Sequence, residues 1–134
     1  MQINYIEKDG KKLFSFYRHD YQRFDSGEFI DGGFDYTRSS GDLKSDTIWN
    51  LIADIRQQFR WGQNYDKNDK LLPETKYGLL KDLDFYHIIG ILRYFTEKLS
   101  PPQSINAEWK AFHLIFLYEL QYRIINQIEE TKIV

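Results

Sequence analysis

The hydrophobic period of the chain changes once, near Gly41, and this change limits the folds that the sequence can adopt. Up to about Ser39, aromatic and β-branched residues come in short runs separated by turn-forming residues, which is typical of antiparallel strands. Beyond Gly41, apolar residues recur at intervals of three and four, the period of an amphipathic helix. The sequence therefore predicts an α+β fold, with an N-terminal antiparallel β-meander packed against about three C-terminal α-helices.

The chain is long enough for one hydrophobic core. It has 134 residues, of which 42% are hydrophobic and 17% aromatic. It shows no internal repeat or low-complexity tract, and only three prolines are available to mark a linker. We therefore expect a single domain over residues 1–134, with mainly strands over about 1–40 and mainly helices over about 45–130.

Two hairpin turns are expected in the first forty residues. Asp9-Gly10 has the composition of a tight two-residue turn, since both residues tolerate positive φ, and it separates two aromatic runs. Asp31-Gly32-Gly33 separates residues 28–30 from residues 34–38, which predicts a second hairpin. The glycines there are either a turn or part of a recognition site.

The first helix is predicted to begin at a cap formed by Ser45 or Asp46 and to end near Phe59. Residues 61–70 are polar and rich in turn formers, so we expect a surface loop. Residues 77–80 have the composition of a short returning strand.

A second amphipathic helix is predicted after a cap at Asp82 or Asp84, and Pro101-Pro102 marks a break after it. The last helix is expected to start near Ser104 or Asn106 and to run past Arg123.

The last helix is apolar around most of its circumference, so more than one side must be covered. Either it is the central core helix, or residues 106–128 form the interface of a homo-oligomer. Glu119 lies four residues before Arg123, the order of an ordinary helix-stabilising pair worth about 0.2–0.5 kcal/mol.

Charge and cysteine content exclude several classes of function. The 18 basic and 20 acidic residues give a net charge of -2, so we expect no general nucleic-acid binding. The absence of cysteine removes disulfides and thiolate chemistry and favours a cytosolic setting. No apolar run approaches the roughly 18 residues of a membrane span, and the N-terminus lacks the features of a signal peptide. We therefore expect a soluble protein without a membrane partner.

Catalytic motifs are weak. His19-Asp20 is the best acid–base pair, but adjacent residues on a strand point to opposite faces, which favours a turn role for Asp20. The sequence shows no metal-ligand spacing, no serine or cysteine nucleophile motif and no phosphate-binding loop. We expect no metal and no cofactor, and binding is favoured over catalysis.

Residues suited to binding a ligand or a partner are more frequent in this sequence than catalytic motifs. The arginines near the glycine turn can form two-point hydrogen bonds with phosphate or carboxylate groups, and the neighbouring aromatic rings can stack on a ligand. Arginine and tyrosine together are also typical of protein-binding hot spots. The candidate ligand- or partner-binding residues are Arg18, His19, Arg23, Asp31, Tyr36, Arg38 and Trp61.

A series of short motifs spans most of the chain. They are His19-Asp20, Ile30-Asp31-Gly32-Gly33, Asp35-Tyr36-Thr37-Arg38, Phe59-Arg60-Trp61-Gly62, Leu80-Lys81-Asp82-Leu83, His87-Ile88 and Glu119-Leu120-Gln121-Tyr122-Arg123. This succession resembles a family of small accessory proteins of tailed bacteriophages, to which no chemistry is assigned. The resemblance implies a phage-encoded protein made in the host cytoplasm.

Three functions are compatible with these observations. The leading hypothesis is a non-enzymatic protein that binds and inhibits or modulates a host protein, including one of anti-phage defence, through the Arg/Tyr-rich N-terminal surface. The first alternative is an oligomeric sponge that sequesters a nucleotide signalling molecule. The second is a small hydrolase using His19 with Asp20, Asp31 or Asp35.

Overall fold

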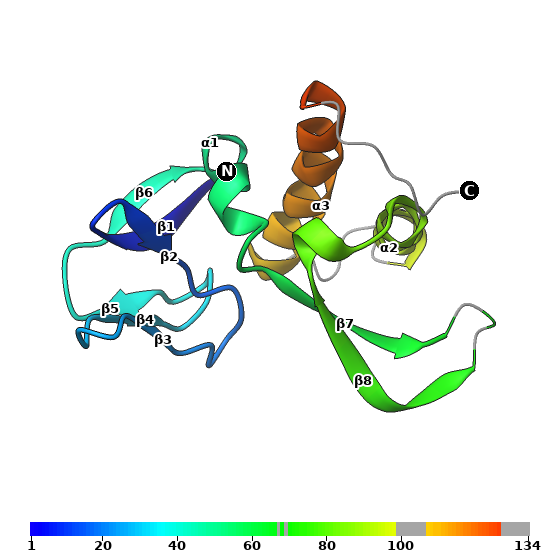
Figure 1. Cartoon of the computed structure of the whole chain (residues 1–134), viewed down its shortest axis with the longest axis horizontal. Helices are drawn as coiled ribbons and strands as arrows, with labels where there is room; N and C mark the ends of the chain where they lie inside the picture. The colour runs from blue at the N-terminus through cyan, green and yellow to red at the C-terminus, as the bar shows by residue number, and fades with distance from the viewer. Residues whose placement is uncertain (67, 69, 99–106, 127–134) are drawn as a thin grey trace.

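A computed structural model describes residues 1–66, 68, 70–98 and 107–126, and Figure 1 shows how their strands and helices are arranged. Within these residues, antiparallel strands form the N-terminal part and three helices lie in the C-terminal part, so the predicted α+β class is confirmed. The predicted break at Pro101-Pro102 and the predicted start of the last helix at Ser104 or Asn106 lie outside the described residues.

The first sheet has the order β2-β1-β6 and is antiparallel throughout. Its strands are β1 (Gln2–Lys8), β2 (Lys11–Leu13) and β6 (Lys44–Thr47). Asp9 and Gly10 connect β1 to β2 with φ values of 51° and 80°, as the predicted hairpin turn requires. β6 was not predicted, because its four polar residues carry no apolar alternation of their own.

The second sheet has the order β3-β4-β5. Its strands are β3 (Gln22–Arg23), β4 (Phe29–Asp31) and β5 (Arg38–Ser39). Pairing of β4 with β5 confirms a hairpin around Asp31-Gly32-Gly33. The second strand starts only at Arg38, so most of residues 34–38 belongs to the connection and not to a strand.

Helix α1 (Ile48–Ile55) is capped by Thr47 and not by the predicted Ser45 or Asp46, which lie two residues and one residue earlier. The Thr47 Oγ1 atom accepts a hydrogen bond from the Asn50 amide at 3.2 Å, whereas Asp46 supports the same turn by accepting from the Thr47 amide at 2.7 Å. The helix ends at Ile55 and not near Phe59. The chain then turns and continues as a strand.

The largest correction concerns the predicted surface loop over residues 61–70. Residues in this stretch form β7 (Arg60–Tyr65), which pairs with β8 (Leu71–Leu79) as a two-stranded antiparallel hairpin. Figure 1 shows the hairpin extending away from the helices. The second half of the chain therefore contains strands as well as helices, and β8 is longer than the predicted strand at residues 77–80.

After β8, a short 3-10 turn η1 (Leu80–Asp82) leads into α2 (Phe85–Lys98). The Asp84 Oδ1 atom accepts from the His87 amide at 2.8 Å, which confirms one of the two predicted caps. The last helix, α3 (Ala107–Ile125), packs against α1 and α2. Its buried apolar residues belong to the main hydrophobic core, as the interpretation of α3 as a core helix predicts, whereas the homo-oligomer interface stays a prediction.

One aromatic cluster joins the two halves of the chain. The fully buried ring of Phe59 lies 5.1 Å from Phe16, 5.6 Å from Phe112 and 5.7 Å from Phe116, measured between ring centroids. Since Phe16 follows the first hairpin and the other two partners lie on α3, this cluster belongs to one core and one domain.

A buried ionic network fixes α3 against its neighbours. Glu119 accepts from Arg56 Nε at 2.8 Å and from Arg123 Nε at 2.7 Å, and all three residues are buried. Arg123 Nη2 also donates to the carbonyls of Leu80 and Leu83, at 3.1 and 2.6 Å. The sequence predicted an ordinary helix-stabilising pair of Glu119 and Arg123. The pair is instead buried, and Arg56 from α1 forms a second ion pair with the same carboxylate.

Candidate functional site

Arg38, a predicted recognition residue, forms a local ion pair with Asp31. Its Nε and Nη2 atoms donate to the two carboxylate oxygens of Asp31, at 2.9 and 3.1 Å, across the pairing of β4 with β5. The Tyr36 ring lies 5.9 Å from the Arg38 guanidinium carbon and is 71% exposed. The pair stabilises the hairpin and leaves Tyr36 on an open surface.

Arg18 and His19 lie on an exposed turn and Arg23 lies on the exposed strand β3; among the described residues, no hydrogen bond or ion pair joins any of them to Arg38. His19 has a φ of 72°, in the left-handed region, and the Asp20 amide donates to the Tyr17 carbonyl at 2.9 Å. Arg18 lies near Glu108 at the start of α3; burial raises the pKa of that carboxyl, and Arg18 opposes the rise. Neither these residues nor Arg38 lines any of the depressions described below.

The acid–base pair of His19 with Asp20, which the sequence made the less favoured alternative, is not formed. The Asp20 carboxylate accepts from the Phe16 amide at 2.9 Å and from Gln22 Nε2 at 2.6 Å. Among the described residues, none forms a hydrogen bond or ion pair with the His19 imidazole. Asp20 therefore has the turn role that its position next to His19 indicated.

Gly32 and Gly33 shape the connection between β4 and β5. Both have positive φ, 93° and 70°, and a Cβ atom on Gly33 would lie 2.7 Å from the backbone of Tyr17. The Gly33 amide also donates to Ser15 Oγ at 2.9 Å. The glycines therefore have a structural role: they allow this turn to pack closely against the segment that contains Ser15 and Tyr17.

Trp61, the remaining predicted site residue, lies on β7 and packs on the aromatic core. Its ring centroid is 5.0 Å from that of Phe116 and 5.7 Å from that of Phe112. It is only partly buried, and its open side lines two of the depressions described next.

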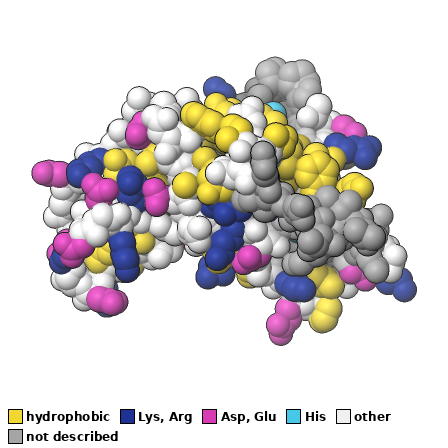
Figure 2. All heavy atoms as spheres, turned by 45° about the horizontal axis from the view of Figure 1, so that its top comes forward, with side chains coloured by type: hydrophobic (Ala, Val, Ile, Leu, Met, Phe, Trp, Pro, Cys, Tyr) yellow, Lys and Arg dark blue, Asp and Glu magenta, His cyan; other side chains and the backbone are white. Residues whose placement is uncertain are grey.

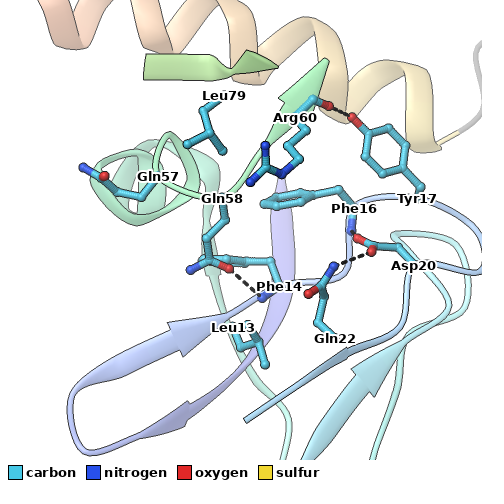
Figure 3. Close-up of a pocket in the computed structure, with 10 residues that line it drawn as sticks. All are labelled: Leu13, Phe14, Phe16, Tyr17, Asp20, Gln22, Gln57, Gln58, Arg60 and Leu79. Carbon is cyan, nitrogen blue, oxygen red and sulfur yellow. Dashed lines mark hydrogen bonds between the residues drawn. The ribbon is translucent and has the colours of Figure 1, made fainter. Parts of the chain in front are cut away.

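Three adjoining depressions follow β7 from its first residue to its last, and together we call them the β7 groove. The first, of about 270 Å³, lies between the N-terminal segment and the end of α1 (Figure 3). Figure 2 shows a hollow between the part with the N-terminal sheets and the part with the hairpin, with basic side chains on its wall. The residues of the first depression are Leu13, Phe14, Phe16, Tyr17, Asp20, Gln22, Gln57, Gln58, Arg60 and Leu79.

Arg60 is the cationic group of this first depression. Figure 3 shows its guanidinium directed into the depression from β7, while Gln22 enters from the opposite side. No ion pair or hydrogen bond links that guanidinium to any residue that the structure describes. In contrast, both polar atoms of the Gln58 side chain are hydrogen-bonded: its oxygen accepts from the Phe14 amide and its nitrogen donates to the Lys12 carbonyl. Arg60 is therefore available for an external carboxylate or phosphate.

The second depression, of about 490 Å³, is mainly apolar. Its residues are Tyr17, Arg60, Trp61, Gly62, Tyr77, Trp109 and Phe112. The Tyr17 hydroxyl donates to the Arg60 carbonyl and so lies between the first and second depressions. Burial raises the pKa of Tyr17, which keeps this hydroxyl protonated as a donor.

The third depression, of about 660 Å³, lies between β7 and α2. Residues 61–66 form one wall and Asp84, Tyr86, His87, Gly90, Ile91 and Tyr94 form the other. No residue of β8 lines it, so it lies on the side of β7 away from β8. Burial lowers the pKa of His87, with a smaller opposing effect of Asp84, so the imidazole is neutral at neutral pH.

Sequence reasoning identified Trp61 but missed the strand that carries it. Phe59 and Trp61 alternate with polar residues, and this period of two was a signal for a strand. The polar composition after Gly62 hid that signal. The role of Arg60, Tyr77 and Tyr86 depends on pairing and packing between distant segments, which no local pattern shows.

Within the described residues, no three acidic, histidine or cysteine side chains are grouped closely enough to hold a metal ion. None of the helices in this part of the chain has the length and apolar character needed to cross a bilayer. No family model matches the chain, and searches of curated proteins and of solved structures found no significant match.

Proposed function

We propose that this protein acts by binding a partner protein in the β7 groove and not by catalysing a reaction. The observation that carries the proposal is the continuity of the groove, in which three depressions share residues along one strand. Tyr17 and Arg60 are common to the first and second, and Trp61 and Gly62 to the second and third.

The composition of the groove supports a protein partner. The groove combines the exposed Tyr77 ring, partly buried tryptophan rings and Arg60, whose guanidinium is unpaired among the described residues, and these residue types dominate protein-binding hot spots. A strand rises about 3.3 Å per residue, so the six residues of β7 match an extended partner segment of about the same length. Arg38 is the weaker anchor, since Asp31 already occupies its guanidinium.

The resemblance to accessory proteins of tailed bacteriophages supports a host protein as the partner. Binding would then inhibit or modulate that host protein, and proteins of anti-phage defence are one such class. We propose the host cytoplasm as the place of action.

Affinity capture from a bacterial lysate tests the proposal. We expect a captured protein that is lost with Arg60→Ala and with Tyr77→Ala, since both side chains are exposed and line the groove. Arg23→Ala is the matched control, because Arg23 is an exposed arginine that lines none of the three depressions. Capture that survives both groove variants but is lost with Tyr36→Ala would move the site to the N-terminal surface and refute the proposal.

A nucleotide is a second candidate ligand. The observation in its favour is that Tyr17, Tyr77 and Trp109 offer aromatic faces beside Arg60, in a depression of about 490 Å³. A ligand that binds only the folded protein raises its melting temperature by mass action. A thermal-shift screen with mono- and cyclic nucleotides, combined with the solution mass of the protein, tests this sponge function. No shift with any nucleotide would eliminate it.

A further inference from the structure

We infer that the third depression takes a basic segment of the partner in extended conformation. The segment adds as a strand to the free edge of β7 at Gly62 and places a lysine or arginine side chain among Tyr65, Tyr86 and Tyr94. This inference rests on the proposed function, since it names the chemistry of the partner at one end of the β7 groove.

The backbone of β7 shows where a strand can add. The Leu80 amide donates to the Phe59 carbonyl at 2.8 Å, so this pair is a hydrogen-bonded one. Hydrogen-bonded pairs alternate with non-bonded pairs in an antiparallel ladder, and the register pairs Arg60 with Leu79 and Gly62 with Tyr77. The amide and carbonyl of Arg60 and Gly62 therefore point away from β8.

Of these two residues, only Gly62 is open to a partner strand. The Arg60 carbonyl already accepts from the Tyr17 hydroxyl. Gly62 lines the third depression, and within the described residues its outward backbone groups have no partner. An extended segment can therefore exchange two hydrogen bonds with Gly62, which is the pairing used in strand addition.

The charge of the third depression selects a cation. Among the described residues that line it, Asp66 and Asp84 are the acidic ones, and none is a lysine or an arginine. Each carboxylate accepts from backbone amides of its own turn or helix start, which fixes its position, and no basic side chain among the described residues forms an ion pair with it. His87 adds no positive charge at neutral pH, because burial lowers its pKa. A basic side chain is thus complementary, whereas an acidic one is repelled.

The tyrosines supply the second attraction for a cation. Tyr65, Tyr86 and Tyr94 all line the depression and are 57%, 63% and 52% exposed. A lysine or arginine over such rings gains a cation–π attraction in addition to its interaction with the carboxylates. Arg60 lies at the opposite end of the β7 groove, so the basic side chain of the partner belongs at the end near Tyr65.

Three synthetic peptides test the inference on the full chain. Each has about six residues of alternating threonine and valine, the length that matches β7. One has lysine at its centre and one has glutamate. The third has lysine but carries N-methyl groups on the amides of one edge. We expect the lysine peptide to bind at least about tenfold more tightly than the other two, and to shift the Gly62 amide resonance.

The double variant Asp66→Asn with Asp84→Asn removes the two charges but keeps oxygen atoms that can accept from the same backbone amides. We expect it to lose the preference for lysine over glutamate. Asp82→Asn is the matched control, since Asp82 is exposed and lies outside the depression. We expect this control to keep the preference.

The outcomes separate the inference from the proposed function. Equal binding of the lysine and glutamate peptides, binding that leaves the Gly62 amide unshifted, or no binding of any peptide overturns the inference. If capture from lysate depends on Arg60 and Tyr77 but not on the two aspartates, the proposed function is retained and the inference of a basic partner segment is rejected. If capture depends on none of these residues, the proposed function itself fails.

Discussion

At the scale of single residues, the interior charge of Glu119 stands out, because two guanidinium groups surround one buried carboxylate. Removing one partner of such a group leaves an uncompensated charge, which costs more than the pair contributes when it is intact. Arg56 also lies over the Tyr122 ring, 4.6 Å from its centroid, so it is fixed on two sides.

We expect Glu119→Gln to lower the free energy of unfolding by about 3–5 kcal/mol, because the amide leaves Arg56 and Arg123 buried with their countercharge lost. Urea denaturation followed by circular dichroism measures the change. Glu97→Gln is the control: its partner Arg93 is 3.8 Å away on the exposed face of α2, and this loss is expected to stay within about 0.5 kcal/mol. Similar losses for the two variants would contradict the role of burial.

The glycine turn gives the second prediction at this scale. Gly33→Ala introduces a Cβ atom against the Tyr17 backbone and places alanine at a φ of 70°, so we expect destabilisation of more than about 1 kcal/mol. Gly41→Ala, at a position with no atom within 4 Å of the new Cβ and no positive φ, is the control. Thermal denaturation compares the two, and equal melting temperatures would refute the close approach of the turn to Tyr17.

At the scale of elements, local patterns predicted what depends on local chemistry. The Asp9-Gly10 turn, the apolar stripe of α1 and the Asp84 cap follow from neighbouring residues, and the structure confirms them. β6 and β7 were missed because a polar strand is defined by its partner, as Lys44–Thr47 is by β1. Most of the candidate site was missed for the same reason, since Arg60, Tyr77 and Tyr86 come from elements that meet only in the folded chain.

Helix α2 carries the prediction on pH. Burial lowers the pKa of His87 below its ordinary value of 6.5, so the unfolded chain binds the proton more tightly than the folded one. Stability from this group is therefore present at neutral pH and is lost as pH falls below about 6.5 towards the lower folded pKa. We expect the free energy of unfolding, from urea curves at pH 7.5 to 5.5, to fall more steeply in the natural chain than in His87→Gln.

Comparison of the two proteins isolates His87 from the other titrating groups. Glu7 and Glu28 have lowered pKa values, so their contributions are lost only at pH values below about 4.5. The raised pKa of Glu108 acts in the opposite direction, but it is common to both proteins. Parallel slopes for His87→Gln and the natural chain would show that the imidazole charges equally well in both states.

At the scale of the whole molecule, the contact of the Tyr17 hydroxyl with the Arg60 carbonyl connects the N-terminal turn to β7. Tyr17→Phe keeps the ring on Phe59 and Phe112 but removes the donor, so we expect a loss of about 0.5–1.5 kcal/mol. Urea denaturation measures the loss, and hydrogen exchange at the Trp61 amide, which faces β8, reports on the strand. Tyr21→Phe, on the exposed outer face, is the control and should leave both unchanged.

The ionic network also has a consequence for how the chain unfolds. Glu119 meets Arg56 across 63 residues of sequence, and Arg123 meets carbonyls 43 and 40 residues earlier. A state in which α3 has detached while the rest remains folded would leave these charges partly desolvated and unpaired, and so it is poorly populated. Intermediates in which α3 alone has detached are therefore disfavoured, and α1, η1 and α3 should melt in one cooperative transition.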